Sequence, residues 1–191
     1  MPEAHRMKEE NQTKDIAPFR ESLTEAGLNS QDIYALKKNP DLLVRFYPFD
    51  FKDSPAAGLE KFRRGMRVLE ELRDQYGIAI PRLRHVAGSE NGEKGVYTVV
   101  DRIYGENLKE APAELLEQGH RALDQMFERF ARYYSDVYRN GGDYWYEFGL
   151  KQIMYGHRKE ETADRPYLVD VDPLYQTYDP QNPRQGYGSM A

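Results

Sequence analysis

Two long stretches of the chain place hydrophobic residues on one face of a helix. The first begins at Ser54-Pro55, a favourable helix start, and ends at Gly77, a favourable helix stop. Its large apolar residues recur every three or four positions, at Leu59, Phe62, Met66, Leu69, Leu72 and Tyr76. The second runs from Pro112 to Asn140-Gly141-Gly142, with an apolar face made of Leu116, Leu123, Phe127, Phe130, Tyr134 and Val137. We expect two amphipathic helices.

Shorter stretches rich in aromatic and β-branched residues predict strands. Asp32 to Leu36 and Leu42 to Tyr47 flank the turn residues Lys37 to Asp41, so we expect a hairpin there. Arg82 to Val86 and Val96 to Ile103 predict a second hairpin.

Three further segments complete the expected order of elements. Gln152 to Tyr155 and Tyr167 to Val171 could pair as a last hairpin. Ile16 to Ala26 predicts a short helix that ends at Gly27. From Gln176 onward the chain is rich in Gln, Pro, Gly and Tyr, which is typical of a tail. Helices alternating with hairpins predict a mixed α+β fold.

Two acidic residues, Asp170 and Asp172, follow the last predicted strand in the segment R-P-Y-L-V-D-V-D-P. A strand end holds a carboxylate stiffly, and Mg²⁺ commonly takes one or two carboxylates together with phosphate oxygens. A solvated Asp-x-Asp-Pro turn would use the same residues, because Asp and Pro are ordinary turn residues. The segment alone leaves both interpretations open.

A second segment, G-V-Y-T-V-V-D-R-I-Y-G-E-N-L from Gly95 to Leu108, changes this balance. Together the two segments resemble the aminoglycoside phosphotransferases and the wider protein-kinase-like superfamily, over about Leu23 to Pro173. In that family the first strand leads into the hinge that holds adenine, and the second carries the metal-binding Asp. The resemblance implies a kinase-like two-lobe α+β fold, in which an antiparallel sheet with a packed helix precedes a reduced helical lobe.

The resemblance also divides the chain and implies a site for ATP and Mg²⁺. The parts would be an N-terminal segment (1–22), an N-lobe-like sheet and helix (23–104), a reduced C-lobe-like region (105–173) and a tail (174–191). Asp143 would be the catalytic base. The metal ligands would be Gln152, Asp170 and Asp172. Three parts would bind the nucleotide. The phosphate loop would contain Gly27, Asn29 and Ser30, and Arg45 would stand at the position of the family's ATP-contacting Lys. The hinge would contain Arg102, Ile103 and Tyr104.

Several of these positions have simpler interpretations or depart from the family pattern. Gly27 could be a helix cap, and Arg45 could be an outward side chain of an alternating strand. Asp143 could be a turn residue, because the family's His is missing and Phe148 stands where an Asn is expected. Glu60 could pair with Arg45. The aromatic residues Tyr144, Trp145, Tyr146 and Phe148 fit core packing better than a ligand platform.

Composition narrows the functional classes. The chain has 191 residues, of which 39% are hydrophobic and 31% charged, as in a globular protein. It contains no cysteine, which excludes disulfides and thiolate metal sites. The net charge of -5 argues against nucleic acid or an anionic membrane as the main partner. No apolar run approaches the ~20 residues that span a bilayer, and the first residues lack a secretory signal, so we expect a cytoplasmic protein.

Three functional hypotheses follow. The first is a pseudokinase-like binding or regulatory protein with a degenerate nucleotide and Mg²⁺ site. The second is an active phosphotransferase that uses ATP on a small hydroxyl substrate. The third is a structural interaction module that binds a protein partner. We favour the first because Arg45 replaces the Lys, the His-x-Asp…Asn pattern is broken, and only Pro173 to Ala191 remain for an acceptor lobe.

Overall fold

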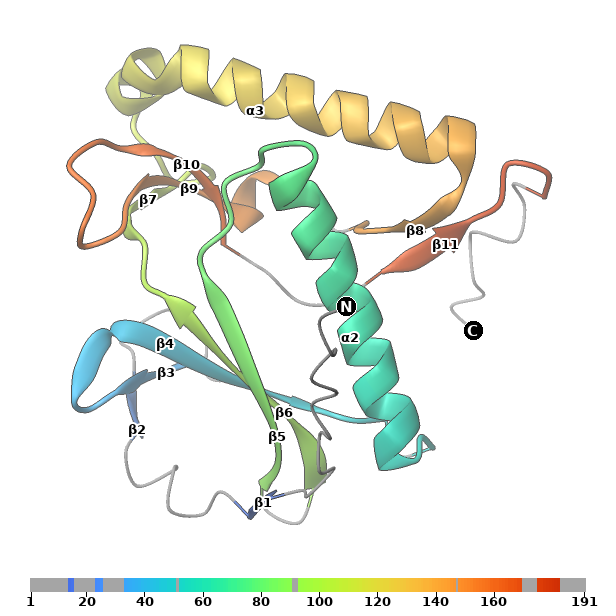
Figure 1. Ribbon diagram of the computed structural model, residues 1–191. Helices are drawn as coiled ribbons and strands as arrows, with labels where there is room; N and C mark the ends of the chain where they lie inside the picture. Colours follow the sequence, from blue (N-terminus) through green and yellow to red (C-terminus); the bar gives the residue numbers. More distant parts are fainter. Residues whose placement is uncertain are drawn as a thin grey trace, which may run out of the picture.

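The computed structural model describes residues 14–15, 23–25, 33–50, 52–90, 93–146, 148–169 and 175–182 (Figure 1). Its helices are α2 (Pro55–Asp74), α3 (Ala113–Asn140) and the short 3-10 helix η1 (Leu150–Gln152). The first strands are β1 (Lys14–Asp15), β2 (Leu23–Glu25), β3 (Ile33–Leu36), β4 (Asn39–Pro48), β5 (Leu83–Glu90) and β6 (Glu93–Asp101). The later strands are β7 (Tyr104–Asn107), β8 (Gly142–Tyr144), β9 (Ile153–His157), β10 (Arg165–Leu168) and β11 (Gln176–Tyr178).

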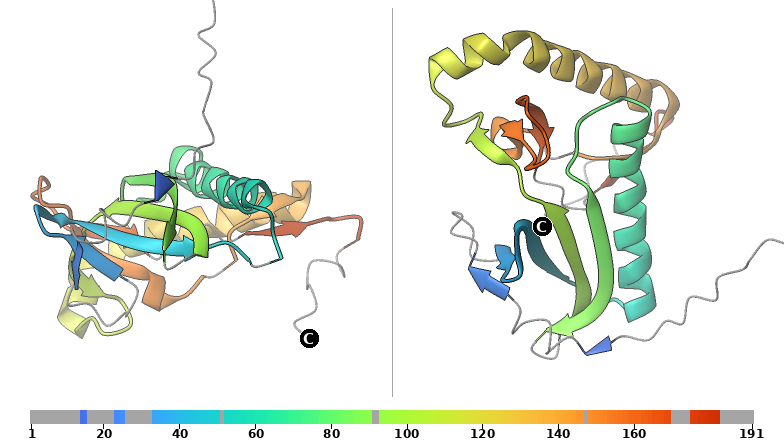
Figure 2. Two further views of the ribbon diagram at one scale, coloured as in Figure 1. Left: turned by 90° about the horizontal axis from the view of Figure 1, so that it is seen from below. Right: turned by 60° about the vertical axis from the view of Figure 1, so that its left-hand side comes forward.

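The larger sheet has the strand order β1-β5-β6-β4-β3-β2 and is antiparallel except for the β1–β5 pair. Because side chains alternate between the faces of a strand, Val44 and Tyr97 point to one face and pack together. The opposite face carries Tyr47 and Val96, which pack in the main core with Phe62 of α2. Helix α2 therefore covers one face of this sheet (Figures 1 and 2).

Local sequence explains both ends of α2. The Ser54 hydroxyl accepts a hydrogen bond from the Ala57 N–H at 3.2 Å, and Pro55 stands in the first turn. At the other end, Gly77 has φ 67° and donates its N–H to the Arg73 carbonyl, while Ile78 donates to the Leu72 carbonyl. The bond from the Gly77 N–H to the Arg73 carbonyl is that of an αL helix C-cap, which requires a residue that tolerates positive φ.

Helix α3 crosses above the three-stranded sheet β10-β9-β7 in the view of Figure 1. The two elements approach closely at Gly119, where an added Cβ would lie 2.8 Å from the Tyr155 ring. Farther along α3, Tyr133 and Phe130 pack with the fully buried Trp145. The backbone N–H of Trp145 donates to the Tyr133 hydroxyl at 3.0 Å. The aromatic segment after α3 therefore contributes to the core through Trp145.

Strands β8 and β11 form a two-stranded antiparallel sheet beside the C-terminal end of α3 (Figure 1). The expected tail thus begins with a strand, because Gln176 to Tyr178 pair with Tyr144 to Gly142. In addition, the Tyr178 ring stacks on Tyr138 of α3 with the centroids 5.5 Å apart.

The mixed α+β fold, both long helices and the three hairpins agree with the sequence expectations. The helix expected over Ile16 to Ala26 is wrong where the structure describes it, because residues 23–25 form β2 and pair with β3. Pairing with a neighbouring strand outweighs the weak local preference of so short a segment. The boundary expected between residues 104 and 105 falls inside β7. In the described part of the chain, neither α2 nor α3 combines the length and apolar character of a membrane span.

Candidate functional site

A pocket of about 240 Å³ lies where the larger sheet meets the three-stranded sheet. One part of its wall is the linker from Asp101 to Gly105, which leads from β6 into β7. The rest is apolar and consists of Leu43, Pro81, Val100, Met154 and Val169. Because these residues come from distant parts of the sequence, the pocket is a product of the tertiary fold.

The linker places the buried residue Ile103 in the wall of the pocket. Ile103 lies between the β6 and β7 ladders, and its side chain is 7% exposed. Among the described residues, none of the loop and turn hydrogen bonds uses its N–H or its C=O. Its neighbour Arg102 donates its N–H to the Asp41 carbonyl at 2.7 Å. Ile103 is therefore a buried residue of the pocket wall whose backbone has no recorded loop or turn bond within the described residues.

The same face of the larger sheet carries Arg45. Leu43 and Val100 are cross-strand partners, and both line the pocket. The next pair on this face is Arg45 with Thr98, because side chains two positions apart share a face. The Arg45 guanidinium lies 5.0 Å from the centre of the Tyr47 ring. Arg45 is thus on the pocket side of the sheet, although it does not line the pocket itself.

Polar side chains secure the end of the linker. The Tyr104 hydroxyl donates to Asp41 at 2.5 Å, and Lys159 donates to the other oxygen of that carboxylate at 2.5 Å. The hydrogen bond from Lys159, followed by that from Tyr104, lowers the pKa of Asp41. The hydrogen bond to Asp41 raises the pKa of Tyr104. The Arg102 guanidinium lies over the Tyr104 ring at 5.4 Å from its centre.

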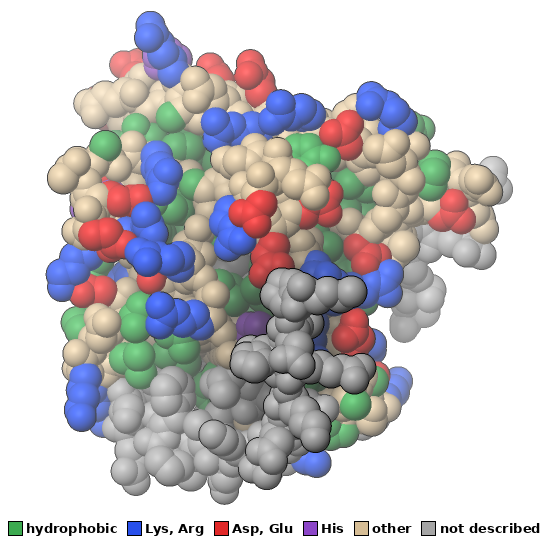
Figure 3. Space-filling model, viewed as in Figure 1, with side chains coloured by type: hydrophobic (Ala, Val, Ile, Leu, Met, Phe, Trp, Pro, Cys, Tyr) green, Lys and Arg blue, Asp and Glu red, His purple; other side chains and the backbone are tan. Residues whose placement is uncertain are grey.

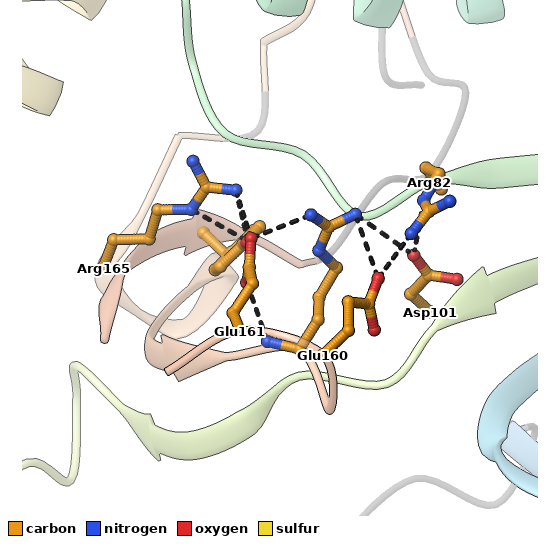
Figure 4. A network of polar contacts seen from close by, with 7 residues as sticks. Arg82, Asp101, Glu160, Glu161 and Arg165 are labelled. Carbon is orange, nitrogen blue, oxygen red and sulfur yellow. Dashed lines mark hydrogen bonds and ion pairs between the residues drawn. The ribbon is translucent and has the colours of Figure 1, made fainter. Parts of the chain in front are cut away.

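A larger network secures the start of the linker (Figure 4). Asp101 pairs with Arg82 at 3.1 Å and with Arg158 at 3.6 Å. Arg158 also donates to Glu161 at 2.8 Å. Glu161 accepts further hydrogen bonds from the side chains of Arg165 and Tyr167. The hydrogen bond from Arg158 is the main reason that the pKa of Glu161 falls to about 2.

Asp143, the expected catalytic base, lies in a different environment. Its carboxylate accepts two hydrogen bonds from Arg64 of α2 and one from Thr177 of β11. Partial burial raises the pKa of Asp143, but the hydrogen bonds from Arg64 and Thr177 outweigh this effect and leave it below its usual value. Asp143 does not line the pocket. In this conformation its oxygens are occupied by protein donors.

Gln152, one of the expected metal ligands, is 2% exposed, and its Oε1 has no hydrogen-bond partner among the described residues. Its backbone carbonyl accepts a hydrogen bond from the Val169 N–H at 2.8 Å, which ties Gln152 to a pocket residue. Asp170 and Asp172, the other expected metal ligands, lie outside the described residues. Within the described ranges, no cluster of three or more His, Asp or Glu side chains could hold a metal ion.

The expected phosphate loop, Gly27, Asn29 and Ser30, also lies outside the described residues. Of the expected nucleotide residues, Arg102, Ile103 and Tyr104 line the pocket. The Glu60 carboxylate, considered as a partner of Arg45, pairs with Arg67 of its own helix at 3.0 Å. On the face shown in Figure 3, outside the grey atoms, positive and negative side chains are interspersed.

The chain matches no protein-family model and no curated protein. Its function must therefore be inferred from the pocket and its surroundings. Sequence reasoning found the linker but missed Asp41 and Lys159, which lie 118 positions apart. No spacing rule connects such residues. The alternation along β4 could have assigned Leu43 to the pocket, because it shares a face with Arg45.

Proposed function

We propose that the protein is a kinase-like nucleotide-binding protein of the pseudokinase type, with a binding or regulatory role. The observation that carries this proposal is the position of Arg102 to Tyr104, the expected adenine hinge, in the wall of the pocket. The order of the elements also supports it. Two strands, a helix, two strands, a linker, a helix and a final hairpin follow one another as the resemblance implies.

The chemistry of the pocket suits a purine base. A purine has two apolar faces and an edge that carries hydrogen-bond donors and acceptors. Leu43 of the larger sheet and Met154 of the smaller one supply apolar surface, and the Ile103 backbone supplies a donor and an acceptor. A mostly apolar cavity with few convergent polar groups is the usual form of a small-molecule site.

The size of the pocket limits what it can enclose. Its volume of about 240 Å³ lies below the ~300–1,000 Å³ common for ligand sites. The base of ATP would therefore occupy the pocket, while the ribose and phosphates would extend beyond it. Most of the binding energy would then come from the base, so adenosine should bind nearly as tightly as ATP.

The surroundings of Asp143 argue against phosphoryl transfer. This reaction depends on a positioned base or hydroxyl acceptor and on charges aimed at the transferred phosphate. Asp143 is held by Arg64 and Thr177, and Arg45 stands where a compact ammonium would be expected. For Mg²⁺, the buried Oε1 of Gln152, which has no hydrogen-bond partner among the described residues, fits the oxygen chemistry of the ion, and Asp170 and Asp172 would supply its charge.

Thermal unfolding of the purified chain tests the proposal. Adenosine, ADP and ATP should each raise the melting temperature, because a ligand at 100 times its Kd stabilises the folded state by about 2.7 kcal/mol. If Asp170 binds Mg²⁺, ATP with Mg²⁺ should give a larger shift than ATP alone, and Asp170→Asn should remove the difference.

Two neighbouring valines provide a matched pair of variants. Val100 lines the pocket, whereas Val99 packs against the cluster on the opposite face of the sheet. Val100→Phe should fill the pocket and abolish the adenosine shift, and Val99→Phe should retain it. The absence of any shift in the wild-type protein would refute nucleotide binding. Phosphoryl transfer that disappears in Asp143→Asn would instead establish the phosphotransferase.

A further inference from the structure

Residues 158–161, the first part of the loop between β9 and β10, contact the larger sheet on both sides of the pocket linker. Arg158 reaches the start of the linker and Lys159 reaches its end. These two side chains are consecutive in the sequence, yet they bind different acceptors on different strands. The loop therefore forms a bridge between the two sheets at the pocket.

At the start of the linker the bridge is partly buried. The Arg158 side chain is only 19% exposed and lies between Asp101, Glu160 and Glu161. Figure 4 shows the Asp101 and Glu160 carboxylates converging with Arg82, which immediately precedes β5, while Glu161 lies beside Arg165. Asp101 is thus held by two guanidinium groups, one from each sheet. Such charge-assisted contacts are stronger than neutral hydrogen bonds and fix the direction of the side chain.

At the end of the linker, Asp41 is the common acceptor. Its carboxylate binds Lys159 and the Tyr104 hydroxyl, while its backbone carbonyl accepts the Arg102 N–H. Lys159 therefore acts on Tyr104 through Asp41. A substitution that removes the Lys159 contact would therefore weaken how Asp41 holds both Tyr104 and Arg102.

Between these ends, the Ile103 backbone has no partner in the described loop and turn hydrogen bonds. Its position depends on the anchors at either side. We propose that Arg158 and Lys159 are positioning residues of the pocket, which set the geometry of residues 102–104. The identity of the ligand rests on the proposed function, but the effect on the linker does not.

Hydrogen exchange of backbone amides separates positioning from general stabilisation. In Arg158→Met, exchange at residues 102–105 should accelerate about tenfold, while amides in β4 and α2 keep their wild-type rates. Lys159→Met should accelerate exchange near Tyr104. The control is Arg73→Met, which removes an exposed ion pair with Asp74 on α2 and should leave the linker unchanged. If Arg158→Met does not fold, Glu161→Gln removes one partner of Arg158 while preserving the shape of the side chain.

Adenosine binding provides the second readout, with Arg158→Met expected to weaken it by about tenfold relative to Arg73→Met. An equal acceleration of all amides, or unchanged exchange in the linker of both loop variants, would overturn the proposal. So would unchanged adenosine affinity in a variant with a loosened linker. If the wild-type protein binds no adenosine, the proposed function fails, and the exchange rates still decide whether the loop positions the linker.

Discussion

Arg64 on α2 and Asp143 on β8, 79 positions apart, form a two-pronged ion pair. The Arg64 Nη2 lies 2.6 Å from one carboxylate oxygen, and Thr177 of β11 donates to the same oxygen at 2.6 Å. The Arg64 guanidinium also lies over the Tyr175 ring. The contact therefore joins the helix of the larger sheet to the β8–β11 pair.

Removing the charge of Asp143 should weaken this junction. We expect Asp143→Asn to lower the free energy of unfolding by about 1 kcal/mol, because Arg64 is nearly half exposed and solvent screens the pair. A double-mutant cycle with Arg64→Met, followed by urea unfolding, measures the coupling. Strictly additive effects would contradict the pairing. The nucleotide-induced shift in melting temperature should survive in Asp143→Asn, since this residue does not line the pocket.

Glu161 should make stability depend on acid pH. Its pKa in the folded protein is about 2, below the ~4.3 of an unperturbed Glu, mainly because Arg158 donates to it. The resulting stabilisation is fully present above pH ~4.3 and is lost as the pH falls toward 2. Glu161→Gln should lower stability at neutral pH and flatten this part of the pH profile. Urea midpoints measured between about pH 5 and about pH 2 provide the check, because this range spans the unfolded and folded pKa values of Glu161.

Leu69 tests the packing of α2. This side chain is 3% exposed in the main core, so Leu69→Ala should destabilise the protein by about 2–5 kcal/mol. Leu150→Ala is a suitable control, because Leu150 is 52% exposed and its truncation should cost less than about 0.5 kcal/mol. Equal denaturation midpoints for wild type and Leu69→Ala would show that the buried face of α2 is misassigned.

Gly119 tests the approach of α3 to β9. In a free helix, Gly→Ala would stabilise by about 1 kcal/mol. Here the new methyl group would press on the Tyr155 ring, and overpacking costs about 1–3 kcal/mol, so Gly119→Ala should be destabilising. In a Tyr155→Ala background the same substitution should become stabilising. The same sign in both backgrounds, measured by thermal or urea unfolding, would rule out the close approach.

Periodicity predicted the helices because each buries a continuous apolar face. The buried side chains of α2 include Phe62, Met66, Leu69 and Leu72, all on the expected face. The hairpin of β9 and β10 was also predictable. Arg102, Ile103 and Tyr104 line the pocket, while their role in a binding site stays a prediction. These features are encoded over short distances in the sequence.

Other features depend on residues that meet only after folding. β2 is a strand because β3 supplies its hydrogen-bond partners, and β11 is a strand because β8 does. The Arg64 partner of Asp143 and the Lys159 partner of Asp41 lie far from them in the sequence. A single sequence gives no local signal for such pairs. The predicted role of Asp143 as a base remains a prediction, although its contacts favour a structural role.

The pairing of β11 with β8 has a consequence for biosynthesis. Thr177 contacts Arg64, which precedes it by 113 positions. Chains emerge from the ribosome N-terminus first, and contacts between distant residues form late. During translation, α2 and the larger sheet can assemble while the segment containing Tyr175 and Thr177 is still inside the exit tunnel. The contacts of Arg64 with Tyr175 and Thr177 then form only after synthesis has passed β11.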